Sequence, residues 1–350
     1  MKSIRVLIVE DSAVVREFLR EIVSADSRLE VVAAVGSAEE ALEVLHHAAP
    51  DVISLDIRLP GMDGFEATRR IMSERPTPIV VVSSASESTE LNLTMGALRA
   101  GALSVVEKPA ATSHEHYEAL AGRLCTQLAI MSQVHVVRQR PSSGQVPQSS
   151  TAPGLSRAPR SILAIVASTG GPNALMELLS GLGSGFPLPI VVVQHMTPSF
   201  VDGFGTWLAS VSPFPVEVVS GRTPLLPGRV FLAPPNRHLL ADVGWTWVEI
   251  GHPVAHHRPS GDVLLGSIAR NAGSGGIGVL LTGMGEDGAN GLLELRRAGG
   301  YTIVEHESTA VVNGMPAAGI RLGAACEALP LPSIAPRILE LACATARESI

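Results

Sequence analysis

The sequence predicts an α/β protein built from two doubly wound, parallel-sheet domains. Short, strongly apolar runs alternate with segments of helical periodicity, first from about residue 4 and again from residue 161. Such runs are typical of strands buried on both faces of a parallel sheet, with helices as the crossover connections. A stretch rich in Pro, Ser, Gly and Gln separates the two alternations. The expected domains therefore span residues 1–135 and 161–350, joined by a flexible linker at 136–160.

Five strands and five helices are expected in the first domain. The strand segments, in chain order, are IRVLIVE, LEVVAAV, DVISLD, PIVVVSS and LSVVEKP. The first helix is indicated by apolar residues at helical spacing, namely Val15, Phe18, Leu19 and Ile22. The second opens with a capping box from Ser37 to Glu40. The others are expected near residues 65–73, 90–100 and 115–133.

The second domain repeats this alternation with one insertion. Its strand segments are SILAIVA, PIVVVQH, PVEVVS, RVFLAPP, GIGVLLTG and YTIVEH, mostly separated by helical segments. The segment HLLADVGWTWVEI predicts an inserted β-hairpin that turns at Asp242-Val243-Gly244. The second domain is therefore also expected to be α/β.

Composition and charge narrow the class of protein. No uncharged apolar run reaches the roughly 18 residues of a membrane span, and the apolar start is short and ends at Glu10-Asp11, which indicates a strand instead of a signal peptide. The 3 cysteines show no C-x-x-C spacing, which favours a reducing compartment and argues against structural zinc. We expect a cytoplasmic monomer that is not inserted into a membrane.

Charge is unevenly distributed between the domains. Residues 1–125 hold 12 Lys or Arg and 19 Asp or Glu, whereas the remaining residues hold 14 of each kind. A protein that binds nucleic acid through phosphates needs a surplus of basic charge. The neutral second domain lacks one and shows no helix-turn-helix pattern, so a nucleic-acid partner is not expected.

Polar side chains gather where the strands of the first domain end. The carboxyl ends of parallel strands meet at one edge of an open sheet, and here they carry Glu10-Asp11, Asp56, Ser83-Ser84 and Lys108-Pro109. Each group alone has an ordinary explanation as a helix cap or a loop residue. Three clustered carboxylates repel one another unless a cation joins them, and ligation by oxygen alone suits Mg²⁺. The chain has 24 arginines and only 2 lysines, so a retained Lys108 suggests a need for a compact point charge.

These segments resemble the receiver domain of two-component response regulators, a flavodoxin-like fold. The motifs VEDS, LDIRLPGMDG, VVSS and EKP carry the resemblance, which covers residues 4 to about 125. It implies that Asp56 accepts a phosphoryl group from a histidine kinase and that Glu10, Asp11 and Asp56 hold Mg²⁺. It further implies that Ser83 and Lys108 contact the phosphoryl oxygens. Many receivers have an aromatic switch residue where this chain has Val105, so the conformational response to phosphorylation is expected to differ.

Three residues of the second domain suggest acyl transfer. Ser168, His195 and Asp287 each follow a predicted parallel strand, which brings them to one edge of the sheet. A serine, a base and an orienting carboxylate are what an activated hydroxyl nucleophile requires. Each residue also has a plain alternative: the Ser-Thr-Gly-Gly run as turn geometry, His195 as a packing residue and Asp287 as a helix cap. Ser168 lacks a G-x-S-x-G elbow, which argues against an ordinary α/β-hydrolase.

The second domain resembles the catalytic domain of the CheB family of chemotaxis protein-glutamate methylesterases. The motifs ASTGGP, VVVQHM, HRPSGDVLL, LTGMGEDGANG and VVNGMP carry the resemblance from about residue 161 to 325. It implies a Rossmann-like fold in which Ser168 is the nucleophile, His195 the base and Asp287 the residue that orients the imidazole. Backbone amides at Thr169 and Met284 are implied as oxyanion donors.

Function and partners follow from both resemblances. They imply a phosphorylation-activated serine esterase that hydrolyses glutamyl methyl esters on the cytoplasmic helices of chemoreceptors and also deamidates receptor glutamines. The esterase chemistry needs no cofactor. Val166 and Asn313 depart from the family pattern and predict a change in the shape of the pocket.

The sequence allows two other interpretations. A non-enzymatic regulator that sequesters partners is the alternative function, which the intact Ser168, His195 and Asp287 disfavour. The segment HPVAHH suggests a metal site at His252, His256 and His257, but no carboxylate with suitable spacing lies nearby. We expect a polar loop beside the active site instead.

Overall fold

The computed structural model describes residues 3–83, 88–108, 114–134 and 159–343. The chain divides into two compact units, Met1–Ser142 and Ser143–Ile350. The predicted linker at 136–160 lies outside the described residues, apart from Pro159 and Arg160. In the described part of the chain, no helix combines the length and the apolar character that a bilayer crossing requires.

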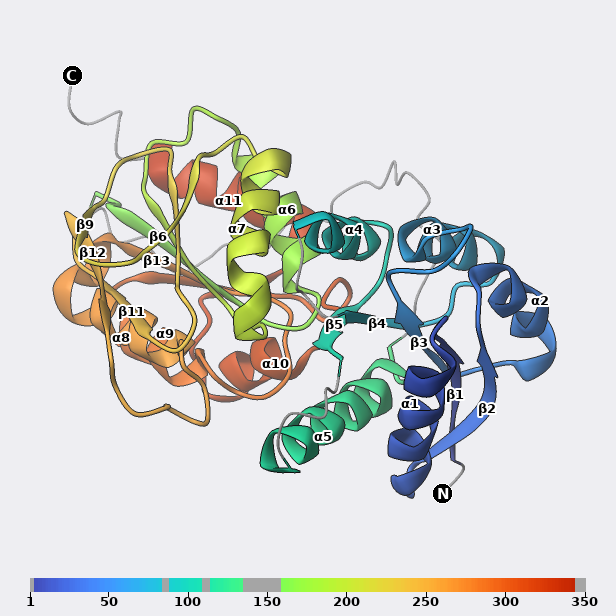
Figure 1. The fold of residues 1–350 in the computed structure, drawn as a ribbon. Coiled ribbons are helices and arrows are strands. Elements are labelled where there is room, and N and C mark those ends of the chain that lie inside the picture. Colours follow the sequence, from blue (N-terminus) through green and yellow to red (C-terminus); the bar gives the residue numbers. More distant parts are fainter. Residues whose placement is uncertain (1–2, 84–87, 109–113, 135–158, 344–350) are drawn as a thin grey trace. The chain divides into compact units, whose positions relative to one another are not determined.

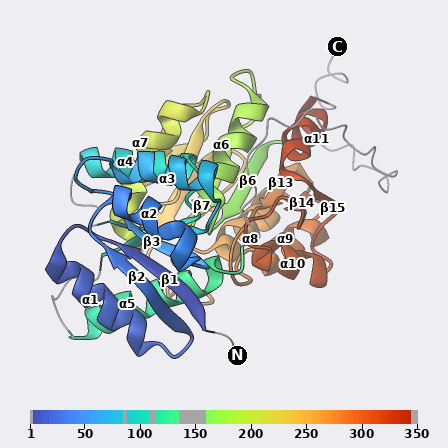
Figure 2. The same ribbon diagram turned by 90° about the vertical axis from the view of Figure 1, so that its right-hand side faces the viewer.

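The first unit is a five-stranded parallel sheet in the order β2-β1-β3-β4-β5. Its strands are β1 (Ile4–Val9), β2 (Leu29–Val35), β3 (Val52–Asp56), β4 (Ile79–Ser83) and β5 (Ser104–Glu107). Its helices are α1 (Ala13–Ala25), α2 (Ala38–Ala48), α3 (Gly64–Glu74), α4 (Ser88–Arg99) and α5 (His114–Met131). Helices α1 and α5 cover one face, and α2, α3 and α4 cover the other (Figures 1 and 2). The predicted doubly wound fold is confirmed.

Local sequence explains where the first helices begin. The hydroxyl of Ser12 accepts the Val15 amide at the start of α1. At α2, Ser37 Oγ accepts the Glu40 amide at 3.2 Å, as the capping box predicts. The Glu40 carboxylate reaches one residue further back than that motif requires and accepts from the Gly36 amide. Each cap satisfies a backbone N–H that has no partner within its helix.

The second unit contains a seven-stranded parallel sheet in the order β15-β14-β13-β6-β7-β10-β8. Its strands are β6 (Ile162–Ala167), β7 (Ile190–Gln194), β8 (Val216–Val218), β10 (Val230–Leu232), β13 (Gly276–Leu280), β14 (Tyr301–Glu305) and β15 (Glu327–Leu329). The four central strands β6, β7, β13 and β14 are buried along their whole length. Strand β15 was not predicted, because its residues Glu-Ala-Leu favour helix and none is β-branched, whereas the equally short edge strand β8 is Val-Glu-Val.

Helices cover both faces of this second sheet. They are α6 (Gly171–Leu182), α7 (Val201–Val211), α8 (Gly261–Asn271), α9 (Ala289–Arg297), α10 (Gly314–Arg321) and α11 (Leu331–Cys343), with short 3₁₀ turns η1 (Pro198–Phe200) and η2 (Gly273–Gly275). Helices α6, α7 and α11 lie on one face, and α8, α9 and α10 lie on the other (Figures 1 and 2). The second unit is thus doubly wound as well.

The predicted hairpin is present and larger than expected. Strands β11 (His238–Ala241) and β12 (Trp245–Glu249) pair antiparallel across the turn at 242–244. Strand β9 (Thr223–Pro224) adds to β12 and completes a three-stranded antiparallel sheet. The contribution of β9 was not predicted, because it consists of only two residues and one of them is proline.

Both sheets have a point where the strand order changes direction. In the first sheet this point lies between β1 and β3, and in the second it lies between β6 and β13. Helices that follow the two strands leave toward opposite faces, which opens a crevice at the carboxyl ends of those strands. Functional groups are therefore sought at the ends of β1 and β3, and of β6 and β13.

Candidate functional site

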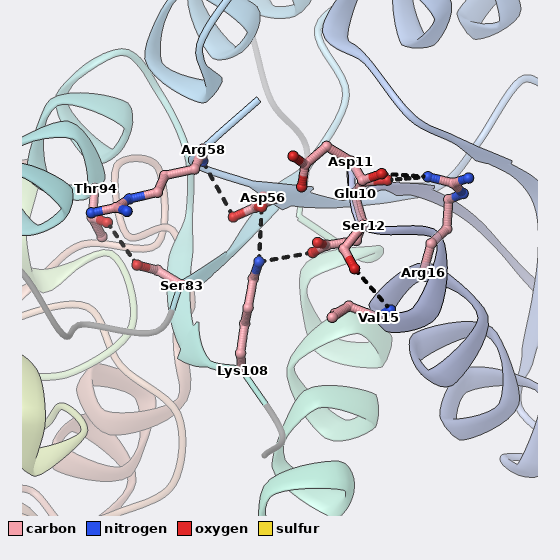
Figure 3. Close-up of polar contacts among 10 residues, drawn as sticks. All are labelled: Glu10, Asp11, Ser12, Val15, Arg16, Asp56, Arg58, Ser83, Thr94 and Lys108. Carbon is pink, nitrogen blue, oxygen red and sulfur yellow. Dashed lines mark hydrogen bonds and ion pairs between the residues drawn. The ribbon is translucent and has the colours of Figure 1, made fainter. Parts of the chain in front are cut away.

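The crevice of the first unit holds two buried carboxylates and a lysine (Figure 3). Glu10 follows β1 and Asp56 ends β3, with side-chain exposures of 1% and 2%. Lys108, which follows β5, places its Nζ 2.9 Å from Glu10 Oε2 and 2.8 Å from Asp56 Oδ2. Asp11 is exposed beside them. One ligand atom from each of the three carboxylates lies within 4.8 Å of the others.

Burial and mutual repulsion dominate the electrostatics of this cluster. Burial, followed by the charge of Asp56, raises the pKa of Glu10 above its ordinary value. Burial likewise raises the pKa of Asp56, although Lys108 acts in the opposite direction. Burial alone would lower the pKa of Lys108, but the two carboxylates outweigh it and raise that pKa. Clustered hard oxygen donors with this surplus of negative charge fit a divalent cation such as Mg²⁺.

The remaining predicted phosphoryl contact lies on β4. Ser83 is fully buried, and its Oγ accepts a hydrogen bond from Thr94 Oγ1 at 3.2 Å (Figure 3). Ser84 and Pro109 lie outside the described residues. Val105, which stands where many receivers have an aromatic residue, is half-buried in β5 and pairs with Val81.

Ser168 lies at the crevice of the second sheet. It directly follows β6 and precedes α6, and its amide donates to the Thr282 carbonyl at 3.0 Å, just beyond β13. Its carbonyl accepts from the Gly171 amide in the first turn of the helix. The serine is half-buried. This is the position that the doubly wound topology leaves open for a ligand.

Gln194 joins the serine loop to the histidine loop. It is the last residue of β7 and is 5% exposed. Its side-chain Nε2 donates to the Ser168 carbonyl at 2.8 Å and to the His195 carbonyl at 2.9 Å. Gln194 therefore fixes the loop that carries the predicted nucleophile relative to the loop that carries the predicted base. No pattern in the sequence singled out this residue.

His195 and Asp287 face each other. His195 Nε2 lies 2.8 Å from Asp287 Oδ2, and the Asp287 side chain is completely buried. The carboxylate also accepts from Ser260 Oγ at 2.6 Å and from the Gly261 amide at 2.6 Å. Burial acts to raise the pKa of Asp287, but the contacts with His195 and then with Ser260 and Gly261 outweigh it and hold that pKa below its ordinary value. Asp287 is therefore ionised at neutral pH.

Ser260 was not identified from the sequence as a site residue. It caps α8, since its Oγ also accepts from the Val263 amide at 3.4 Å. The available signal was a serine directly before an apolar helical run, which predicts a cap and gives no indication of the contact with Asp287. The Ser260 hydroxyl thus caps α8 and also donates a hydrogen bond to the buried carboxylate of Asp287.

Ser260→Ala is expected to lower the turnover of a reaction that uses the His195–Asp287 pair by about 10- to 100-fold, because a hydrogen bond to a charged group contributes about 1.5–3 kcal/mol. Stability should also fall by about 1 kcal/mol through loss of the cap. Ser37→Ala is the matched control, because it removes the cap of α2, where no carboxylate of the site is involved. Both variants are compared by turnover of the acyl substrate that the predicted serine chemistry requires, and by urea unfolding. Equal activity in the two variants would contradict a role for Ser260 at Asp287.

The predicted oxyanion donors lie close to Ser168. Gly283 approaches so closely that a β-carbon there would sit 2.7 Å from the Cβ of Ser168. Among the described residues, the amides of Thr169 and Met284 have no hydrogen-bond acceptor within the protein. Met284 is 44% exposed. Free amides beside the serine are suitable donors for an oxyanion.

The two residues expected to change the shape of the pocket, Val166 and Asn313, lie in or beside the crevice. Val166 is fully buried in β6, and its side chain fills the space that a β-carbon at Gly261 would need. Asn313 forms an isolated bridge with Gly283 and directly precedes α10. Val166 therefore packs beneath the loop that holds Asp287, and Asn313 packs beside the loop that holds Met284.

A buried glutamate supports the loop after β13. Glu305 ends β14, is 1% exposed, and accepts from the Thr282 amide at 2.8 Å. Thr282 Oγ1 in turn donates to the Thr169 carbonyl at 2.9 Å. Burial raises the pKa of Glu305 from 4.5 to about 7. Its carboxyl group therefore changes charge near neutral pH, inside the fold.

Glu305→Gln is expected to flatten the pH dependence of stability of the second unit. Because the folded pKa is about 7 and the unfolded value 4.5, the folded state binds the proton more tightly. The resulting stability is fully present below pH 4.5 and is lost as pH rises through 7, by about 3 kcal/mol. All 3 tryptophans (Trp207, Trp245 and Trp247) belong to this unit, so urea unfolding followed by their fluorescence reports on it alone. Parallel curves for wild type and variant would refute the expectation.

Comparison with known proteins assigns each of the two units to a protein family. Residues 163–338 match the family model described as CheB methylesterase, and residues 6–118 match the response regulator receiver domain. A protein-glutamate methylesterase/protein-glutamine glutaminase of Paramagnetospirillum magneticum is 55% identical and covers 97% of this chain and 98% of its own length. A relative of the same description from Myxococcus xanthus is 42% identical, with 96% of each chain covered.

A solved structure supports the assignment of the second unit. The crystal structure of the Thermotoga maritima CheB methylesterase catalytic domain is 35% identical, with a TM-score of 0.51. The match covers 53% of this chain and all of that one. On the strength of the whole-length relatives and of both domain matches, this chain belongs to the CheB methylesterase family and carries a response regulator receiver domain.

Proposed function

We propose that this chain hydrolyses glutamyl methyl esters on chemoreceptors and deamidates receptor glutamines, with Ser168 as nucleophile, His195 as base and Asp287 as the residue that orients the imidazole. The observation that carries the assignment is the His195–Asp287 pair at 2.8 Å, held beside Ser168 by Gln194. The relatives named above carry both activities in their descriptions. The function is adaptation in chemotaxis.

The reaction follows from these groups. Ser168 Oγ attacks the ester carbonyl carbon while His195 takes its proton, and the amides of Thr169 and Met284 bind the developing oxyanion. His195 then returns the proton to the leaving oxygen, so that methanol departs and a glutamyl-serine ester remains. Water repeats the sequence and releases glutamate and free Ser168. With a glutamine substrate, ammonia leaves in place of methanol.

An assay of methanol release from methylated receptor membranes tests this proposal. Release that depends on the protein, and that increases with a phosphodonor, is expected. A regulator that only sequesters partners would bind the membranes and release no methanol. The assay therefore separates the enzyme from the alternative function with one measurement.

The first unit is proposed to be the regulatory domain. Asp56 would accept a phosphoryl group from a histidine kinase, with Mg²⁺ held by Glu10, Asp11 and Asp56. The bound ion would neutralise negative charge on the phosphoryl oxygens during transfer. Lys108 and Ser83 would contact the transferred group. The domain boundaries that go with this proposal are 1–135 and 161–350, with the segment 136–160 as a linker.

Residues 151–350 alone are expected to hydrolyse a small soluble ester about tenfold faster than the unphosphorylated full chain, a typical size for coupling between two sites. The reason is that the unphosphorylated receiver is proposed to restrain the esterase. A phosphodonor should accelerate the full chain and leave the fragment unchanged. A fragment that is no faster would favour recruitment to receptors as the mode of activation, because a small ester needs no docking.

A further inference from the structure

The imidazole of His257 stacks on that of His195. The ring centroids are 4.2 Å apart and the ring planes differ by 13°. His195 uses Nε2 toward Asp287, while its buried Nδ1 has no hydrogen-bond partner among the described residues. His257 thus covers one face of the proposed catalytic base, and Nδ1 is the ring nitrogen that does not face Asp287.

An unusual turn presents His257. Val254 and His257 exchange two backbone hydrogen bonds, at 3.0 and 2.8 Å. The two residues between them, Ala255 and His256, have φ values of 47° and 69°. Turns with two successive positive φ values are normally made by glycine and asparagine, because a β-carbon is disfavoured there. Unfavourable backbone that persists beside reacting groups is a recognised sign of a functional constraint.

The same segment supports the carboxylate. Ser260, three residues after His257, donates to Asp287, and Arg258 closes the loop by donating to the Gly251 carbonyl at 2.9 Å. The loop therefore contacts both members of the His195–Asp287 pair. Because the loop contacts both the ring face of His195 and the carboxylate of Asp287, it restricts rotation of the His195 imidazole.

The charge of His257 suits this position. Burial, followed by the neighbouring His195, lowers its pKa below the ordinary value, while Asp287 acts in the opposite direction and His256 adds to the lowering. A neutral ring does not repel the imidazolium that forms when His195 accepts the serine proton. The face of an aromatic ring attracts a cation.

A shared metal ion is the competing explanation for these groups. One ligand atom each of His195, His257 and Asp287 lies within 4.8 Å of the others. However, an ion bound by imidazole lies in the plane of the ring, along the nitrogen lone pair. Two nearly parallel rings stacked face to face do not direct their lone pairs at one point, so they would have to turn before binding a common ion.

We propose that His257 is a positioning residue of the esterase, whose stacked ring holds His195 with Nε2 on Asp287 and Nδ1 toward Ser168. The inference rests on the proposed serine mechanism. An aromatic ring without nitrogen at position 257 should hold His195 in place nearly as well as the native imidazole. A flexible polar side chain of similar size should not.

His257→Phe and His257→Gln in the full-length protein form the matched pair that tests this. The readouts are kcat and KM for ester hydrolysis and the rate at which a fluorophosphonate labels Ser168, located by mass spectrometry. His257→Gln should lower kcat and the labelling rate by about 10- to 100-fold, a size typical of misplaced reacting groups, with KM unchanged. His257→Phe should stay within about threefold of wild type on the same scale. His256→Asn, on the exposed side of the turn, is the control and should match wild type.

The outcomes separate the inference from the proposed function. Labelling and turnover that are equally slow in the Phe and Gln variants would show that a nitrogen of His257 is needed, for a metal or for proton transfer, and would overturn the positioning role. Wild-type rates in both variants would also overturn it. If fluorophosphonate fails to label Ser168 even in the wild type, the serine mechanism falls and the inference falls with it. Tryptophan fluorescence on urea unfolding checks that each variant is folded.

Discussion

Ser168→Ala is expected to lower ester turnover by about 10⁶-fold, because the members of a serine–histidine–aspartate triad act as a unit. Without Oγ, His195 has no hydroxyl to deprotonate, and only the oxyanion donors and substrate binding remain. The double variant Ser168→Ala/His195→Ala should therefore be little slower than the single one. Methanol release from methylated receptor membranes measures the loss.

Ser161→Ala is the matched control for this experiment. Ser161 directly precedes β6, whereas Ser168 follows the same strand, and the Ser161 hydroxyl contacts the Gly275 carbonyl at 3.3 Å. The control variant should retain wild-type turnover. Near-normal methanol release from Ser168→Ala would remove this serine from the mechanism, however well its neighbours are arranged.

Asp56→Asn should abolish Mg²⁺-dependent phosphorylation by a small phosphodonor, while unstimulated esterase activity remains measurable. Asn lacks the carboxylate oxygen that would accept the phosphoryl group, and it removes one of the two carboxylates that pair with Lys108. Incorporation of labelled phosphoryl is the measurement. The expected loss is complete, because the proposed acceptor is this carboxylate alone.

Glu17→Gln provides the control for that loss. Glu17 is an exposed carboxylate on α1 that pairs with Arg20, so its removal changes the net charge of the unit by the same amount. Labelling should be unaffected. Phosphoryl uptake that persists in Asp56→Asn would identify another acceptor in the receiver and would reassign the cluster around Lys108.

The fold was predictable because buried parallel strands leave a strong trace in sequence. Runs such as ILAIVA and the IVVV that precedes Gln194 are apolar at every inward and outward position, and the structure buries each of them fully. Strand β9 was missed because it has only two residues, one of them proline, and β15 because Glu-Ala-Leu includes no β-branched residue and favours helix. Their place in the sheets depends on pairing with distant strands.

The candidate site was predictable only in part, for a related reason. Ser168, His195 and Asp287 each end a strand, and topology alone brings strand ends together. Gln194 and Ser260 act through contacts with groups 26 and 27 residues away. His257 lies in a segment that was interpreted only as a polar loop, and its stacking depends on a turn with two positive φ values. Such contacts require the folded geometry.

The Gln194 side chain restricts which substitutions evolution can accept at position 171. A β-carbon at position 171 would collide with Oε1 of Gln194 and would also lie 2.9 Å from the Cβ of Ala167. A lineage that replaced Gly171 would have to displace the Gln194 amide, and would then lose the link between the carbonyls of Ser168 and His195. Homologues that keep this glutamine link should therefore keep glycine at position 171. The first turn of the helix after the serine is thus constrained by a residue on the neighbouring strand.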